Sequence, residues 1–520
     1  MPAALVKLGE AVGQGSAPVS QVVPPLAGGV GKRVAVAAAA LLAVGVAAVL
    51  GWQFWSSSHK APQATVAMAD KSIAVLPFTD MSEKKDQEYF ADGMAEEIID
   101  LLVKIPLLKV ISRTSSFQFK GQAQDLRRIG TRLGVAYVLE GGVRKSGDRL
   151  RVTAQLIDSR DGTHLFSQTY DRDLSDVLKI QDEIAIKVVR ATGDDLYIHE
   201  ITSRAALRNT DAYTSYLQGT HAGARFDQQG FEQALSDFQR ALDLDPSFAE
   251  ASAGLASTYL SLGLFGFMPP GIAFEKSRRA AEQALKLDPK LSVAHSFLAD
   301  IHIVYDWDWN AADRELKLAR TLAPKDTVVL EAATLLSLAL GQWDDALKVL
   351  NDSLERAPLD PAGYFYLSGV QVRRERLPEA ETAIRRTLDL SDTFTFAHYE
   401  LCKVLLIRGK PQQALEESQK EPSDAGKLIG SALAYFRLGN KAESDAALAQ
   451  LLKTYAPYIP TGIAAVYAFR GESDEAFKWL DRAYAQKDAF LYRIKVSTEF
   501  DRLHNDARYK PFLKKMNLPE

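Results

Sequence analysis

The chain has 520 residues, which corresponds to about three to four domains of ordinary size, or to fewer if part of it is a repeat array. Its 62 basic and 66 acidic residues give a net charge of -4, so bulk charge does not indicate nucleic-acid binding. The hydrophobic content of 47% excludes wholesale disorder. The one cysteine, Cys402, excludes a disulfide framework, a multi-cysteine zinc site and an iron–sulfur cluster within this chain.

The amino-terminal segment combines a polar tail with a long apolar run. Residues 1–31 are rich in Gly, Pro, Ala and Ser, which predicts a disordered tail. Residues 34–58 carry no charge, and a bilayer core needs about 20 apolar helical residues. A cleaved signal peptide and a buried core helix are the alternatives, but the run and the tail are both long for a signal peptide. We therefore expect a transmembrane helix at 32–56 that contacts the bilayer through 34–55, followed by a linker at 57–71.

The next segment, residues 72–200, alternates strand and helix patterns. Apolar runs bounded by Pro, Gly or turn residues predict strands, and apolar residues at helical spacing predict helices. The predicted strands are 72–78, 107–112 and three runs within 135–172, and the predicted helices are 88–105, 125–134 and 178–196. This order predicts an α+β domain with a mixed sheet.

Several strings of this domain carry a family resemblance. SIAVLPF, EYFADGMAEEII and IGTRLGVAYVLEGGVRKSGDRLRVTAQLIDSRDGTHLFSQTYDR resemble a bacterial domain related to the amino-terminal domain of TolB. In such proteins the domain often lies between a transmembrane helix and tetratricopeptide (TPR) repeats, as in the outer part of CadC-like regulators and of TPR-containing adenylate cyclases. Their cytoplasmic head, a winged helix or a class III cyclase, would not fit in about 31 residues, so we expect it to be lacking here.

The charges around the apolar run predict its orientation. Lys7, Lys32 and Arg33 precede the run, whereas Lys60 and Lys71 follow it. The positive-inside rule therefore favours an inner amino terminus. Together with the resemblance, this predicts a single-pass protein of the bacterial cytoplasmic membrane with most of the chain in the periplasm.

Two groups of polar residues in the predicted α+β domain are candidate ligand sites. Asp80, Glu83, Asp86, Glu88 and Asp92 cluster after the first strand, where a ligand role competes with the ordinary preference of carboxylates for a helix start, which we favour. The segment 113–116 offers hydroxyls that could hold an anion, although capping and turn formation is the favoured interpretation.

From residue 211 onward the chain is helical and periodic. A small residue recurs at one phase, and several of the intervals are 34 residues: Ala234, Ser277, Ala312, Ala346, Ala380, Ala414, Ser444 and Ala476. A period of 34 is typical of the helix–turn–helix TPR unit. We predict about eight repeats between 211 and 487, and a capping segment at 488–520 that shields the last apolar face. The inserted apolar loop 262–275 could pack on a neighbouring domain or contact a partner.

The concave groove of a TPR array is its usual binding surface. By register Phe365, Tyr399 and Lys403 point into this groove, where aromatic anchors and a cation suit a peptide or a helix end. The alternative is that these side chains face solvent or adjacent repeats. We name the three as candidate partner-binding residues.

The motifs of common enzymes are missing from the sequence, including a nucleophile elbow, H-E-x-x-H, a phosphate loop and a dinucleotide fingerprint. We therefore expect no catalytic, cofactor-binding or metal-binding residues, no nucleic acid and no small-molecule substrate. The predicted function is a membrane-anchored, non-catalytic adaptor or sensor whose TPR groove binds a protein, with the TolB-like domain as a docking or sensing module. The alternative is a signalling subunit related to TPR-containing adenylate cyclases or CadC-like regulators, with its output domain on another chain.

Overall fold

The structure is a computed structural model that describes residues 69–122, 125–201 and 209–519. The predicted disordered tail at 1–31, the predicted transmembrane helix at 32–56 and residues 57–68 of the predicted linker lie outside these residues.

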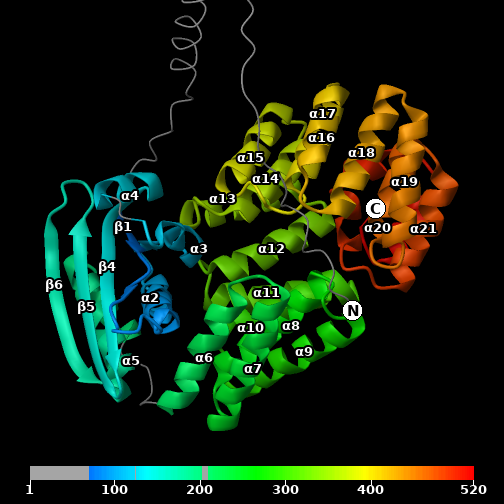
Figure 1. The fold of residues 1–520 in the computed structure, drawn as a ribbon. Coiled ribbons are helices and arrows are strands. Elements are labelled where there is room, and N and C mark those ends of the chain that lie inside the picture. The colour runs from blue at the N-terminus through cyan, green and yellow to red at the C-terminus, as the bar shows by residue number, and fades with distance from the viewer. Residues whose placement is uncertain (1–68, 123–124, 202–208, 520) are drawn as a thin grey trace, which may run out of the picture. The chain divides into compact units, whose positions relative to one another are not determined.

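A mixed sheet forms the first part of the described chain (Figure 1). Its strands run in the order β3-β1-β4-β5-β6, with β2 paired to β4; β1 lies parallel to β3 and β4, and β4, β5 and β6 are antiparallel. The strands are β1 (Ala69–Val75), β2 (Thr79–Asp80), β3 (Lys109–Val110), β4 (Val135–Ser146), β5 (Arg149–Asp158) and β6 (His164–Asp173). The helices are α2 (Glu88–Val103), α3 (Arg113–Ser116), η1 (Phe117–Phe119), α4 (Leu126–Leu133), η2 (Leu174–Asp176), α5 (Val177–Ala191) and η3 (Asp195–Glu200). The mixed sheet predicted from the sequence is confirmed.

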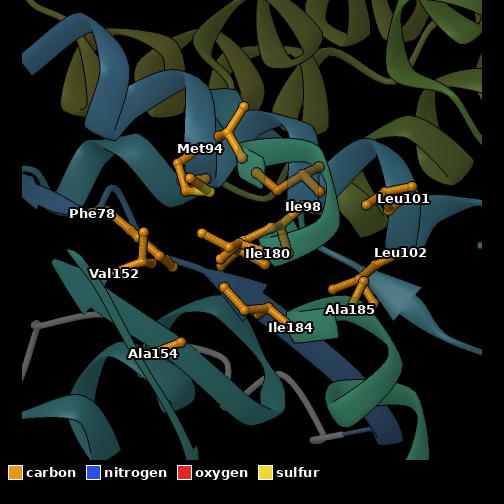
Figure 2. Close-up of a cluster of buried hydrophobic side chains, with 14 of the residues drawn as sticks. Phe78, Met94, Ile98, Leu101, Leu102, Val152, Ala154, Ile180, Ile184 and Ala185 are labelled. Carbon is orange, nitrogen blue, oxygen red and sulfur yellow. The ribbon is translucent and has the colours of Figure 1, made fainter. Parts of the chain in front are cut away.

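The core of this sheet domain lies between one face of the sheet and helices α2 and α5. Figure 2 shows Met94 and Ile98 of α2 facing Ile180 and Ile184 of α5, with Val152 of the sheet beside them. All five side chains are buried. The alternation of buried and exposed residues along β5 explains why one face meets the helices while the other stays polar.

Eight antiparallel helix pairs follow (Figure 1). The pairs are α6 (Thr210–Gly223) and α7 (Gln228–Leu244), α8 (Ala249–Leu264) and α9 (Pro270–Leu287), α10 (Ser292–Ile301) and α11 (Trp309–Leu322), α12 (Thr327–Leu340) and α13 (Trp343–Arg356), α14 (Pro361–Arg373) and α15 (Leu377–Leu390), α16 (Ala397–Ile407) and α17 (Pro411–Lys420), α18 (Asp424–Leu438) and α19 (Lys441–Tyr455), α20 (Pro460–Arg470) and α21 (Ser473–Ala485). The π-helical turn η4 (His302–Asp306) follows α10, and η5 (Leu491–Lys495), η6 (Thr498–Leu503) and α22 (Tyr509–Lys515) end the chain.

The recurring small residue lies where the two helices of a pair approach. All eight of these alanines and serines have no exposed surface, and each lies in the second helix of its pair. Ser277 and Ser444 keep their buried hydroxyls satisfied by donating hydrogen bonds to the carbonyl oxygens of Ala256 and Ala432, at 2.7 and 2.8 Å. The periodicity therefore located the close contacts correctly.

The sheet domain packs on the array at the first helix pair, at the turn before α12, where the Lys325 amine donates to the Pro106 carbonyl, and after α13. Tyr213 and Leu217 of α6 belong to the same hydrophobic cluster as α2 and α5. Farther along the array, the amide of Ser112 donates to the carbonyl of Arg356 at 2.8 Å, and the amide of Leu359 donates to the Ser115 hydroxyl at 2.9 Å. The segment 113–116, considered above as an anion cradle, thus contacts the turn between α13 and α14.

The predicted fold class needs one correction, because it included a transmembrane helix. In residues 69–122, 125–201 and 209–519, no helix has the length and apolar character needed to cross a bilayer. The reason is amphipathicity: even α9, with 18 residues, carries charged side chains such as Glu275, Lys276 and Arg279 along its length. The fold of the described residues is a mixed-sheet domain followed by an all-helical solenoid. The predicted single-pass membrane localisation is corrected on the same finding.

Two glycines of α6 offer a matched test of the packing inside the first pair. A Cβ on Gly219 would lie 2.8 Å from two ring carbons of Phe238, whereas a Cβ on Gly223 would meet only Ala234, at 3.7 Å. We expect Gly219→Ala to lower the free energy of unfolding by about 1–3 kcal/mol through overpacking. Gly223→Ala should leave it unchanged or raise it by up to about 1 kcal/mol. Chemical denaturation of both variants checks this, and equal effects would contradict the close approach.

Candidate functional site

The three predicted groove residues lie under the chain's own carboxyl-terminal end. We call residues 488–518 the C-terminal segment; it contains η5, η6 and α22. Phe365 of α14 and Tyr399 and Lys403 of α16 are on first helices of their pairs, as predicted. The Arg493 guanidinium lies 5.3 Å from the centre of the Phe365 ring, and Tyr399 and Lys403 both contact Glu499. The structure therefore brings the three residues to one surface, which the C-terminal segment covers.

Lys403 and Glu499 form the centre of a buried charged cluster. The Lys403 Nζ lies 2.8 Å from a carboxylate oxygen of Glu400 and 3.5 Å from one of Glu499, and the Tyr399 hydroxyl donates to Glu499. Burial alone would raise the pKa of Glu499, but Lys403 and the Tyr399 hydroxyl hold it below its usual range. Burial also opposes the charge of Lys403, and the two carboxylates outweigh it and raise the pKa of this amine. Lys403 and Glu499 thus both stay charged at neutral pH.

Further polar contacts fasten the C-terminal segment along the inner helices. The Trp309 indole donates to the Met516 carbonyl at 2.8 Å, Lys495 donates to the carbonyl of Leu340 at 3.1 Å, and Arg373 donates to the carbonyl of Val496 at 3.0 Å. Buried apolar side chains of the segment join the core of the array, among them Leu491, Ile494, Phe500, Leu503 and Met516. This segment is an integral part of the array, and the binding of a second protein by Phe365, Tyr399 and Lys403 stays a prediction.

Removal of Lys403 tests the buried cluster. In Lys403→Met the carboxylates of Glu400 and Glu499 remain buried without their cation, so the free energy of unfolding should fall by about 3–5 kcal/mol. Lys317→Met, which removes an exposed i,i+4 pair with Asp313, is the control and should change stability little. Chemical denaturation compares the two, and a small effect at Lys403 would show that the cluster is hydrated.

A second charged cluster joins the sheet domain to the first helix pair. Asp92 of α2 is buried, and its Oδ2 accepts hydrogen bonds from Lys120 Nζ at 2.6 Å and from His221 Nδ1 of α6 at 3.1 Å. Burial alone would raise the pKa of Asp92, but the bonds from His221 and Lys120 bring it below its ordinary value. Glu88 pairs with the same Lys120 amine at 2.6 Å. Asp92 belongs to the acidic group identified in the sequence, whereas no sequence pattern indicates a role for His221.

The lowered pKa of Asp92 gives a testable pH dependence. A carboxylate with a lowered folded-state pKa stabilises the fold above its unfolded value, near 3.9, and the contribution is lost as the pH falls through the folded value. Wild type should therefore melt higher than Asp92→Asn at pH 5, and the difference should shrink at pH 3. Thermal unfolding at both pH values measures it. A difference that is constant with pH would mean that the charge of Asp92 is not what stabilises the junction.

Asp80, Asp308 and Cys402 have structural roles. Asp80 accepts hydrogen bonds from the amides of Ser82 and Gln87, both at 2.8 Å, so it orders the turn before α2. Asp308 accepts from the amide of Ala311 at the start of α11. Cys402 is buried, and burial raises the pKa of its thiol. In the part of the chain that the structure describes, no group of three or more His, Cys, Asp or Glu residues could hold a metal ion.

An aromatic patch lies on the turns of the first two pairs. We define it as Phe226 in the α6–α7 turn, and Phe265 and Phe267 in the α8–α9 connection; they are 65%, 55% and 43% exposed. The rings of Phe265 and Phe267 lie 6.0 and 6.2 Å from the buried ring of Phe231, and Phe226 packs edge-on against Phe265 at 6.4 Å. The inserted loop predicted at 262–275 therefore packs on the preceding helix pair. Phe226, 36 residues earlier than the loop's start, had no signal in the sequence.

Comparison with known families identifies both parts of the chain. Residues 69–203 match the family described as HilA/YgeH-like transcriptional regulator, second domain. Residues 220–266 and 335–393 match tetratricopeptide repeats. The chain thus contains TPR repeats preceded by a HilA/YgeH-like domain, and the finer resemblance of that domain to TolB stays a prediction.

Among curated proteins, a Rhizobium meliloti (strain 1021) protein named "Putative adenylate cyclase 3" is 41% identical over 190 residues. The alignment covers 36% of this chain and 32% of that protein, so the chain matches about a third of its relative's length.

Solved structures with a similar fold include a human IFIT1 dimer with m7Gppp-AAAA, at 16% identity and a TM-score of 0.40, covering 59% of this chain and 85% of that one. Pseudomonas aeruginosa pilF (18% identity, TM-score 0.32) covers 39% of this chain and 94% of its own, and yeast Tom70 (16%, 0.38) covers 60% and 68%.

Proposed function

We propose that this protein is a non-catalytic interaction adaptor whose TPR array holds a protein partner and whose sheet domain is a docking or sensing module. The matches to TPR repeats support protein binding as the general role. The single observation that carries the proposal is the aromatic patch of Phe226, Phe265 and Phe267, because three clustered aromatic rings stay largely exposed at turns of the array.

Two properties of the patch favour contact with a partner. Clustered exposed aromatic side chains mark interaction sites, whereas apolar residues scattered singly over a surface are ordinary. Phe226 also has a φ of 53°, in the left-handed region that bulky residues avoid. At other turns of the array a positive φ belongs to glycines such as Gly439 and Gly471, with φ of 82° and 81°, and to Trp307, Glu375 and Phe396. The ring of Phe226 is exposed, however, whereas that of Trp307 is buried. A strained backbone that presents a ring to solvent favours a function for that ring.

The partner chemistry follows from the patch. The Phe265 ring lies 6.4 Å, centre to centre, from the rings of both Phe226 and Phe267, and the three together present edges and faces that suit aromatic or aliphatic anchor side chains of a protein. The inner face near Phe365, Tyr399 and Lys403 is a less favourable entry, because a partner there would have to compete with the C-terminal segment and its buried contacts.

Site-specific photo-crosslinking in living cells tests the proposal. A photoreactive phenylalanine analogue at Phe267 should give a discrete crosslinked product, and Phe226→Ser with Phe265→Ser in the same chain should abolish it. The same analogue at Tyr458, which is 76% exposed between α19 and α20, is the control and should not yield this product. Identical products from both positions, or none from Phe267, would count against the patch as a partner site.

A second candidate function is a signalling subunit whose output domain is on another chain. The 41% identity over 190 residues to a protein named as an adenylate cyclase favours it, although the alignment covers 32% of that protein. Mass spectrometry of the product from Phe267 separates the two: a nucleotide cyclase or a transcription regulator would favour the signalling subunit, and another class of protein would favour the general adaptor.

A further inference from the structure

A hollow of about 440 Å³ lies between the first helix of the sheet domain and the first helix pair of the array. We call it the junction hollow. Among its lining residues are Tyr89 on α2, His221 on α6, Arg225 in the turn after α6, and Gln233, Asp237 and Arg240 on α7. Gln233, Asp237 and Arg240 follow one another at helical spacing, so α7 presents one stripe to the hollow.

The charge of the junction hollow is mostly positive. Arg240 is exposed and makes no hydrogen bond or ion pair with any described residue. Arg225 uses one nitrogen, Nη2, to contact Asp227 at 3.1 and 3.2 Å, which leaves the rest of its guanidinium available. The carboxylate in the wall, Asp237, is buried and accepts a hydrogen bond from Gln233 at 3.0 Å. Two guanidinium groups thus face the hollow together with one carboxylate, on which the charge of Arg240 acts.

His221 supplies the third donor, and Asp92 fixes its orientation. The Asp92 carboxylate is held by Lys120 and by His221 Nδ1, so Nδ1 carries a proton and donates. Asp92 does not line the hollow, whereas His221 does, so Nε2 on the opposite edge of the ring is the atom available to it. Within the described residues Nε2 has no partner. In its imidazolium form the ring donates from both nitrogens.

We propose that the junction hollow binds an oxyanion, a phosphate or a carboxylate, between the guanidinium groups of Arg225 and Arg240 and the Nε2 of His221. Guanidinium groups suit such anions because their planar donors match two oxygens at once. Binding draws a proton onto His221, since a neutral imidazole with Nδ1 protonated offers only a lone pair at Nε2. The charged groups around this imidazole are Asp92 and Lys120 on one side and Arg225, Arg240 and Asp237 on the other.

The site links the two parts of the described chain. Asp92 belongs to the sheet domain and His221 to the array, and their contact lies next to the packing of α2 on α6. An anion that holds His221 in its charged form strengthens the pair with Asp92, so occupancy stabilises the junction. This site is separate from the aromatic patch, and its test does not depend on the proposed adaptor role.

Isothermal titration calorimetry of the full chain at low ionic strength tests the proposal, with inorganic sulfate and a tetraglutamate peptide as probes. The peptide is acetylated at its amino terminus, so both probes keep their charge between pH 6 and 8 and a pH effect reports on the protein. We expect saturable binding of at least one probe, weakened about tenfold in Arg225→Gln and in Arg240→Gln. Arg279→Gln, an exposed arginine on α9, is the matched control and should bind as wild type. Sulfate alone would indicate a phosphate-type ligand, and the peptide a carboxylate ligand.

The pH dependence of binding tests the role of His221 separately. Wild type should bind more tightly at pH 6 than at pH 8, and His221→Gln should remove this difference while circular dichroism shows an intact fold. Absence of saturable binding of both probes overturns the proposal. So does equal weakening by Arg279→Gln and Arg240→Gln, because that would indicate attraction by overall surface charge.

Discussion

Each helix pair of the array depends on one residue that is too small to hold its two helices apart. Alanine or serine at this position lets the backbones approach, and any larger side chain would have to push into a neighbour that is itself fully packed. The serines show how tight the position is, because Ser277 and Ser444 reach across to a carbonyl of the partner helix in place of water. Repeating this contact along the chain produces the succession of helix pairs.

The C-terminal segment covers the inner face of the later helix pairs. In an open solenoid the first helices of the pairs are exposed to ligands. Here the later pairs are lined by the chain's own residues, which supply apolar side chains together with the charge of Glu499. A buried ion pair adds little net stability compared with apolar packing, but it penalises any arrangement that separates its partners. The polar contacts thereby hold the C-terminal segment in one register along the array.

The sequence was most informative where the pattern is local and periodic. The eight small residues, the helix of the sheet domain that contains Met94 and Ile98, and the turns at Gly439 and Gly471 were all predictable, because each depends on neighbours a few residues away. The positions of Tyr399 and Lys403 on a first helix also follow from register. Their contact with Glu499, about a hundred residues later, does not, since no periodicity relates the two. The pairing of Asp92 with His221 was equally hidden, being 129 residues apart.

The contacts between the sheet domain and the array limit how the number of repeat units can change during evolution. Repeat proteins commonly change length by gaining or losing whole units, because each unit touches only its neighbours. The sheet domain here touches the first pair through Leu217 and the boundary after the fourth pair through Arg356 and Leu359. A unit duplicated between these points would separate one contact from the other. The sheet domain therefore fixes the number of units that lie between its contacts.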